Sequence, residues 1–139
     1  MFFTINTTDS LPIYAQLVRQ IKYAIASRVL RPGQLLPSVR QLSVELTINP
    51  NTVARAYQQL QQEDILESLR GRGLAVRAGA TATCRQMRRE LISQRLHIVL
   101  SEALQSGLAE EDITQLVERH LQSLSSSTPP VEEVDREVQ

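Results

Sequence analysis

The sequence predicts a mainly α-helical fold with one small β-hairpin. Apolar residues recur at intervals of three and four in five separate segments, which is the spacing of one buried face of an α-helix. Only one pair of short segments alternates apolar and polar residues, and these two segments flank a glycine-containing turn. The hydrophobic content of 42% suffices for a packed core, while an aromatic content of 4% without tryptophan suits a helical protein built from aliphatic side chains.

The first helix is expected to follow an N-terminal segment, residues 1–10, that forms either an arm or a short strand. Ser10 is the predicted N-cap of this helix, which would extend to about Val29. The segment RPGQLLPS then ends it, because two prolines and a glycine disfavour a continuous helix. The predicted inner face of this helix consists of Tyr14, Leu17, Val18, Ile21 and Ile25.

Two short helices come next, separated by only three residues. Ser38 is the predicted N-cap of the first, with Gln41 three residues later as its capping-box partner. Asn49 is the predicted N-cap of the second, and Pro50 follows at the first helical position, where its missing N–H costs nothing. These dimensions match a helix-turn-helix. The predicted inward residues are Val39, Leu42 and Leu46 in the first helix and Val53, Ala56, Tyr57 and Leu60 in the second, which would end near Glu63.

A β-hairpin is predicted directly after this motif. ILESL and LAVRA alternate apolar and polar residues on either side of Arg70-Gly71-Arg72-Gly73. A hairpin in this position is a wing, so the order of three helices and a hairpin predicts a winged helix-turn-helix domain over residues 11–79.

Two further helices are predicted after a boundary at AGATAT, near residue 80. The first is long and would end at Ser106-Gly107, and the second would run from about Glu110 to Leu124 with acidic residues in its first turn. Two such helices cannot bury their broad apolar faces alone, so a second copy of the chain is an expected partner. The region 80–124 is therefore predicted to be a helical dimerisation tail. Residues 125–139 are polar, acidic and proline-containing, and we expect them to be disordered.

The charge distribution favours contact between the first part of the chain and a polyanion. The net charge of zero conceals nine basic against five acidic residues in 1–80, a charge of +4, and six against ten in 81–139, a charge of −4. Cys84 is the only cysteine, which excludes an intrachain disulfide and suits a reducing compartment. The start of the chain does not resemble a signal peptide, and no apolar run reaches the length of a membrane span, so a cytoplasmic protein is expected.

The outward face of the third helix has the chemistry of a DNA-reading surface. Asn51, Thr52, Arg55 and Gln59 lie away from its apolar stripe and include no carboxylate. In a helix-turn-helix the second helix enters the major groove with its N-terminus first. Asn51 and Thr52, assisted by free backbone N–H groups, would then reach bases or phosphates, and Arg55 would form two hydrogen bonds to a guanine.

Four segments together resemble the GntR family of bacterial transcription regulators: PIYAQLVRQIKYAI, LRPGQLLPSVRQLSVEL, INPNTVARAYQQL and RGRG, within residues 11–78. The short helical tail is similar to that of the YtrA-type subfamily. This resemblance implies a homodimeric repressor of a partly palindromic duplex operator, in many cases near transporter genes. The sequence departs from the family pattern at Arg28-Val29 and Asp64, where glycine is common, and at Leu74-Ala75 in the wing.

The site residues follow from this combination of pattern and resemblance. Arg40 resembles the family arginine at the start of the second helix, and the wing arginines would enter or flank the minor groove. The candidate DNA-contacting residues are Ser38, Arg40, Asn49, Pro50, Asn51, Thr52, Arg55, Gln59, Arg70, Gly71, Arg72 and Gly73. The candidate dimerisation residues are Met87, Leu91, Ile92, Leu96, Val99, Leu100, Leu104, Ile113, Leu116, Val117 and Leu121.

Other functions are less well supported by the sequence. No phosphate-binding loop, nucleophile motif or metal-ligand spacing is present, so neither an enzyme nor a cofactor is expected. His97 and His120 lie on different helices near apolar stripes, which favours packing or surface roles over a metal site. The alternative is a winged-helix protein-interaction module without DNA binding. A small-molecule effector of unknown identity, bound between the tail and the winged domain, is a further hypothesis.

Overall fold

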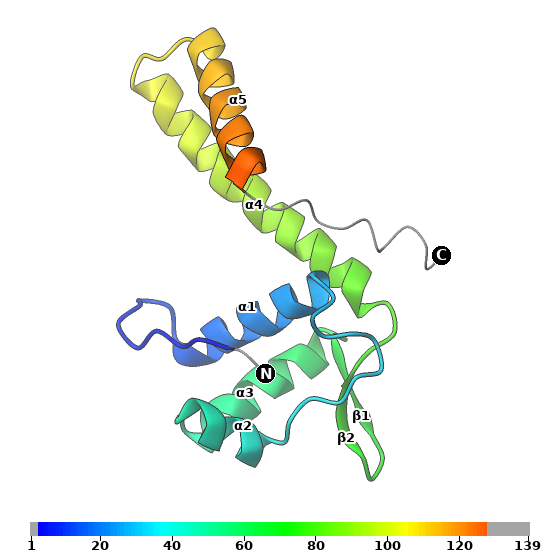
Figure 1. The fold of residues 1–139 in the computed structure, drawn as a ribbon. Coiled ribbons are helices and arrows are strands. Elements are labelled where there is room, and N and C mark those ends of the chain that lie inside the picture. Colours follow the sequence, from blue (N-terminus) through cyan, green and yellow to red (C-terminus); the bar gives the residue numbers. More distant parts are fainter. Residues whose placement is uncertain (1–2, 128–139) are drawn as a thin grey trace. The chain divides into compact units, whose positions relative to one another are not determined.

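A computed structural model describes residues 3–127 (Figure 1). Its elements are, in order, α1 (Ile13–Ala26), α2 (Val39–Leu46), α3 (Pro50–Gln62), β1 (Leu66–Leu69), β2 (Gly73–Val76), α4 (Ala80–Gln105) and α5 (Glu110–Ser127). The chain divides into two compact units, a first unit that ends at Ile92 and a second unit that begins at Ser93. The first unit is a winged helix-turn-helix, which confirms the predicted fold class of a mainly helical chain with one hairpin.

The core of the first unit is formed by the predicted helical stripes. Leu17, Ile21 and Ile25 of α1 are fully buried, and α1 packs on α3, whose Val53 and Leu60 are also fully buried. The hairpin covers this core with side chains from both strands, including Leu66 and Val76. The 3.6-residue periodicity therefore identified the fully buried residues of α1 and α3, because apolar side chains at this spacing share one side of a helix.

The start and the end of α1 differ from the prediction. The helix begins at Ile13 after Pro12, and no side chain caps it, so Ser10 is not its N-cap. Asp9 accepts a hydrogen bond from the Leu11 N–H at 3.0 Å, which forms a turn before the helix instead. At the other end the helix ends at Ala26 rather than Val29, because Arg28 adopts a left-handed φ of 63°.

The helix-turn-helix has the predicted caps. The Ser38 hydroxyl accepts from the Gln41 N–H at 3.1 Å, and the Gln41 side chain accepts from the Ser38 N–H at 3.0 Å, which is a complete capping box. α2 ends in a left-handed residue, Thr47, with a φ of 55°. The Asn49 side chain then accepts from the Asn51 N–H at 2.8 Å, and Pro50 is the first residue of α3, as predicted.

The predicted hairpin is present and short. Leu66 pairs with Val76 and Leu69 pairs with Gly73 in an antiparallel register. The tip is a tight turn, closed by a hydrogen bond of 2.9 Å from the Arg72 N–H to the Leu69 carbonyl. Gly71 has a φ of 73°, a conformation that glycine adopts readily and other residues rarely do.

The N-terminal segment is an arm rather than a strand, as far as residues 3–10 are concerned. Two glutamines of α1 hold it through its backbone. The Gln16 side chain accepts from the Asn6 N–H at 2.9 Å and donates to the Asn6 carbonyl at 2.8 Å, while Gln20 bonds in the same way to the N–H and carbonyl of Thr4. These bonds use main-chain N–H and carbonyl groups of the arm. They therefore hold the arm in place without any alternation of apolar and polar side chains in its sequence.

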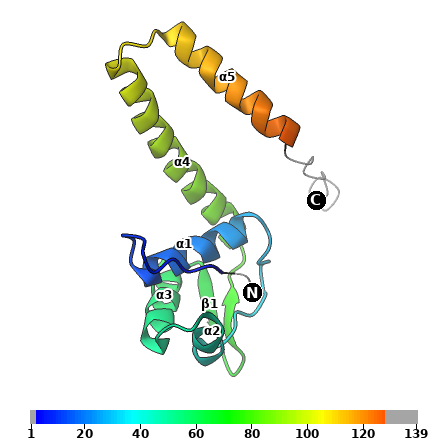
Figure 2. The same cartoon turned by 60° about the vertical axis from the view of Figure 1, so that its left-hand side comes forward.

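The second unit contains the end of α4 and the whole of α5. α4 ends as predicted, since Gly107 adopts a φ of 90° and the N–H of Leu108 bonds to the Ala103 carbonyl at 3.2 Å. α5 diverges from the end of α4 (Figure 2) and begins with three acidic residues, as the sequence predicts. It continues to Ser127, so the predicted helix end at Leu124 is three residues too early, and residues 125–127 do not belong to a disordered tail. The remainder of that predicted tail, 128–139, lies outside the described residues. Among the helices of residues 3–127, none combines the length and the hydropathy that a membrane span requires.

Candidate nucleic-acid interface

The N-terminal end of α3 presents three of the predicted residues together. Asn51 and Arg55 are exposed and Thr52 is half-buried, and all three line a shallow hollow shared with Ile13 and Tyr14 of α1. The backbone differs from the prediction, because the first-turn N–H groups are not free. Asn49 accepts from the Asn51 N–H with its side chain at 2.8 Å and from the Thr52 N–H with its carbonyl at 3.0 Å. Contacts from this turn would therefore come mainly from side chains.

The Arg55 side chain lies over an aromatic ring rather than projecting straight outward. Its guanidinium carbon is 3.8 Å from the centroid of the Tyr14 ring, which is a cation–π contact. Tyr14 was predicted to be a core residue, but its side chain is only half-buried and one ring face is occupied by the arginine. Sequence reasoning missed this pair because the two residues lie on different helices, and no spacing rule relates them.

α2 contributes Ser38 and Arg40. The Ser38 hydroxyl is committed to its capping bond, whereas the Arg40 side chain is exposed on the first turn of the helix. α3 is anchored to the loop that precedes α2, because the buried Tyr57 hydroxyl donates to the Pro37 carbonyl at 2.8 Å. Burial, followed by the charge of Glu45, raises the pKa of Tyr57 above its ordinary value, so the phenol remains a hydrogen-bond donor.

The wing presents Arg70, Gly71 and Arg72 at an exposed tip. At its base, Asp64 and Arg77 form an ion pair of 2.9 Å. The negative charge that Asp64 introduces near the expected phosphates therefore has a cationic neighbour. Asp64 also adopts a left-handed φ of 59°, which explains why its position resembles a glycine position in the family pattern.

Gln59 does not share the surface of the other candidates. It is half-buried, donates to Glu63 at 3.3 Å and lines a pocket together with Lys22 of α1. Gln59 therefore lies apart from the hollow that Asn51, Thr52 and Arg55 line, and its contact with DNA stays a prediction. The flank of α3 on which Gln59 lies turns toward α1, which no periodicity in α3 alone indicates.

The predicted dimerisation residues also differ in their surroundings. Met87 packs against the core of the first unit and Leu91 is half-buried beside it, so one chain alone already covers them in part. Further along, Leu96 and Val99 of α4 and Leu121 of α5 are 49%, 58% and 60% exposed. The two histidines are exposed, and the described residues contain no cluster of three or more metal-binding side chains.

Comparison with known proteins places this geometry in a family. The model of bacterial regulatory proteins of the gntR family matches residues 13–76. The HTH-type transcriptional repressor YtrA of Bacillus subtilis is 34% identical over 113 residues, which are 81% of this chain and 87% of that protein. The chain belongs to the GntR family. The resemblance to this family that the sequence predicts is thereby confirmed.

Other transcriptional regulators are similar over nearly the same length. The HTH-type transcriptional regulator YhcF of Bacillus subtilis is 31% identical and aligns with 77% of this chain and 88% of its own. The crystal structure of a transcriptional regulator from Oenococcus oeni has a TM-score of 0.74 and 34% identity, covering 86% of this chain and 99% of that one. Because these matches extend beyond residues 13–76, this GntR chain resembles its relatives outside the winged helix as well.

Proposed function

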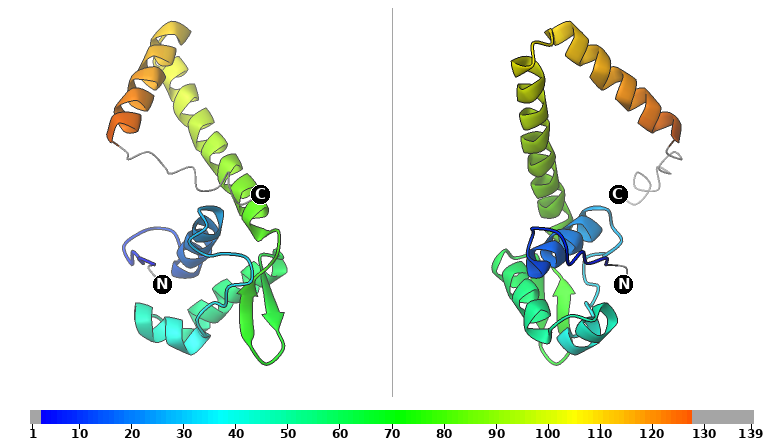
Figure 3. Two further views of the ribbon diagram at one scale, coloured as in Figure 1. Left: turned by 45° about the vertical axis from the view of Figure 1, so that its right-hand side comes forward. Right: turned by 90° about the vertical axis from the view of Figure 1, so that its left-hand side faces the viewer.

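We propose that the chain is a sequence-specific, DNA-binding transcriptional regulator that represses its targets as a homodimer on a partly palindromic duplex operator. The regulatory function follows from membership of the GntR family. The observation that carries the proposed DNA contact is the exposure of Arg40, Arg55, Arg70 and Arg72 on the helix-turn-helix and the wing. α2 and the tip of the hairpin lie at the same end of the first unit in every view (Figures 1–3).

In the proposed complex α3 enters the major groove from its N-terminus. Asn51 and Thr52 would then contact bases or phosphates through their side chains. Arg55 would leave or extend past the Tyr14 ring to form two hydrogen bonds to a guanine, a contact worth about 1–3 kcal/mol of discrimination between bases. Arg40 would bind the backbone beside the groove, and Arg70 and Arg72 of the wing would contact the minor groove or its phosphates.

The second unit supports the proposed homodimer. Its apolar residues, among them Leu96, Val99, Leu116, Val117 and Leu121, are exposed in the single chain. Exposed apolar side chains gathered on two helices are typical of a surface that another protein covers. A two-fold dimer would place two recognition helices about 34 Å apart for adjacent half-sites, which explains the expected palindromic operator.

The proposal is tested by fluorescence anisotropy with the duplex upstream of the chain's own gene and a scrambled duplex of equal length. We expect preferential binding of the upstream duplex with two chains per site. Arg55→Ala should remove most of that preference, whereas Arg89→Ala, which changes an exposed arginine of α4, should leave it unchanged. A reporter gene behind the same duplex then distinguishes repression from activation, with transporter genes as the first targets to examine.

Two outcomes would contradict the proposal. Equal loss of preference in both variants would show that α3 does not read the operator. Failure to bind any duplex at low salt would favour the protein-interaction module, because nonspecific binding by a DNA-binding protein is strongest at low ionic strength.

A further inference from the structure

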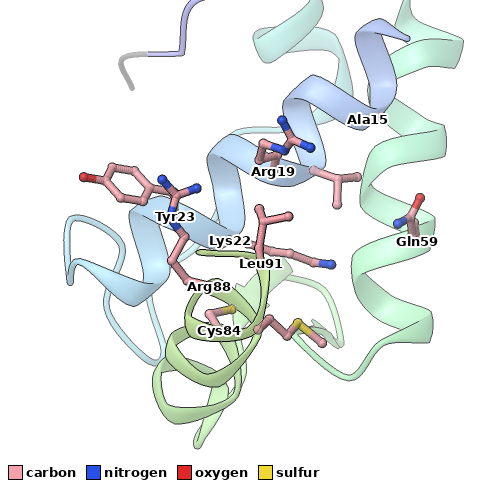
Figure 4. Close-up of a pocket in the computed structure, with 10 residues that line it drawn as sticks. Ala15, Arg19, Lys22, Tyr23, Gln59, Cys84, Arg88 and Leu91 are labelled. Carbon is pink, nitrogen blue, oxygen red and sulfur yellow. The ribbon is translucent and has the colours of Figure 1, made fainter. Parts of the chain in front are cut away.

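A pocket of about 230 Å³ lies between α1, α3 and the first turns of α4 (Figure 4). All its lining residues belong to the first unit. Its apolar wall includes Val18, Met87 and Leu91. Gln59 of α3 contributes an amide, and the Cys84 thiol lines the wall from α4. We call this the α1–α4 pocket.

The same pocket is lined by three cations and by no carboxylate. Arg19 and Lys22 come from α1 and Arg88 comes from α4. Lys22 has a carboxylate partner just outside the lining, since Glu63 lies 2.8 Å from its ammonium. Arg88 lies against the Tyr23 ring (Figure 4), 4.8 Å from its centroid. Within residues 3–127 neither Arg88 nor Arg19 has a salt bridge. Three cationic side chains and no carboxylate among the lining residues give the pocket an electrostatic potential that favours an anion.

Cys84 adds no negative charge to this site. Burial is the main cause that raises the pKa of its thiol from 9.0 to about 11, the charge of Lys22 opposes the shift, and that of Glu63 adds to it. The thiol is therefore neutral near pH 7. The arginines and Lys22 set the electrostatic preference of the pocket, and its apolar wall selects for a ligand with an apolar body.

We propose that the α1–α4 pocket binds a small organic carboxylate with an aromatic or branched apolar body. Its volume suits a ligand of this size, because a dry cavity of about 150 Å³ already holds benzene. The guanidinium of Arg88 or Arg19 would bind the carboxylate through two parallel hydrogen bonds, a geometry that a lysine cannot provide. Val18, Met87 and Leu91 would contact the apolar part of the ligand.

Ligand binding would affect α3 through a short series of polar contacts between side chains. Lys22 pairs with Glu63, which follows the last residue of α3, and Glu63 accepts from Gln59 on the preceding turn. A carboxylate that approaches Lys22 competes with Glu63 for the same ammonium, so the ligand changes the contacts that hold this end of α3 to α1. The consequence, a change in operator affinity, rests on the proposed function, whereas the binding itself does not.

The first experiment measures binding by the full chain in the absence of DNA. Ligand-observed NMR is recorded with sodium benzoate and with benzamide, which has the same ring and nearly the same shape but no charge. We expect saturable binding of benzoate, with an affinity about tenfold above that of benzamide, since hydrogen bonds to charged groups are the stronger ones. Sodium acetate, which lacks the apolar body, should bind much more weakly than benzoate.

A matched pair of variants locates the site. Arg88→Leu replaces the cationic side chain with an apolar one. We expect it to weaken benzoate binding about tenfold while benzamide binding changes little. Arg89→Leu, one residue further along α4 and outside the pocket, should have no effect. Arg19→Gln is the second variant if Arg88→Leu fails to fold, as judged by circular dichroism.

The proposal is overturned if benzoate does not saturate below about 10 mM. It is also overturned if benzamide binds as tightly as benzoate, or if the Arg88 and Arg89 variants lose the same affinity. Operator titrations with and without benzoate form a separate arm. Unchanged operator affinity in the presence of bound benzoate would refute the regulatory consequence and leave the binding site intact. Absence of DNA binding would refute the proposed function and leave the NMR result unaffected.

Discussion

Within residues 3–127, three residues other than glycine adopt left-handed backbone conformations, and each follows a helix. Arg28, Thr47 and Asp64 have φ values of 63°, 55° and 59°. After α2 and α3 the chain turns through the same pair of hydrogen bonds, for example from Ile48 N–H to the Ser43 carbonyl at 3.0 Å. Thr47 is the most strained of the three, because a β-branched side chain fits this conformation poorly.

Thr47→Gly is expected to raise the free energy of unfolding by about 0.5–1 kcal/mol. Glycine removes the steric cost of the left-handed conformation, about 1–2 kcal/mol, but loses more backbone entropy on folding. Urea unfolding followed by circular dichroism measures the change. Ala54→Gly, within α3, is the control and should lower stability by about 1 kcal/mol. A Thr47→Gly variant less stable than the wild type would show that the Thr47 side chain makes a compensating contact.

At the scale of the element, the wing is a charged tip on a short two-stranded hairpin. Arg70 and Arg72 are exposed on a turn whose backbone is fixed by the Arg72–Leu69 hydrogen bond. If both arginines bind phosphates, their effect on DNA affinity is independent of sequence and sensitive to salt. The wing would then contribute to affinity while α3 contributes to discrimination.

The double variant Arg70→Gln/Arg72→Gln is expected to weaken binding of operator and scrambled duplex alike. The slope of log K against log salt should become shallower by about 0.9 for each phosphate contact that is lost. Anisotropy titrations at several salt concentrations measure this slope. Arg95→Gln, an exposed arginine of α4, provides the control. A variant that lost preference between duplexes without any change in slope would instead indicate that the wing reads bases.

At the scale of the whole molecule, the largest unexplained feature of the single chain is the exposed apolar surface of the second unit. Val99 of α4 and Leu121 of α5 are both more than half exposed. Carboxylates at these positions would lose solvation in any interface that covered them. A homodimer built on this surface would therefore be disrupted by a single carboxylate at one of these positions. The fold of the first unit, which does not include them, would not change.

Val99→Glu and Leu121→Glu are each expected to convert a dimer into a monomer in sedimentation experiments at micromolar concentration. Operator affinity should fall at least about tenfold, because each monomer holds only one half-site. Arg119→Glu places the same carboxylate on an exposed polar position of α5 and serves as the control. A wild-type chain that sediments as a monomer would refute the homodimer. If the Val99 and Leu121 variants still sediment as dimers, the dimer interface lies on another surface.

The sequence by itself determined the features that depend on neighbouring residues. The helices, their inner faces, the capping box of Ser38 and Gln41 and the Asn49 cap arise from contacts within one or two turns, so periodicity and cap chemistry predict them. The hairpin follows from alternation around a glycine turn. Ser10 is an exception, because the local turn made by Asp9 and the proline before α1 replaced a side-chain cap. The ends of α1 and α5 also differ from the prediction.

Only the tertiary structure decided which side chains from different elements meet. Tyr14 lies under Arg55 across 41 positions of sequence. Gln59 lines the α1–α4 pocket together with Lys22, and so do Arg88 and Arg19. These contacts depend on the way α1, α3 and α4 pack, which is set by the shape of the whole core. A periodic pattern gives the face of each helix but not its rotation against its neighbours. For this reason the sequence predicted the recognition face in outline and suggested an effector site between the tail and the winged domain, but it did not predict which side chains line the pocket.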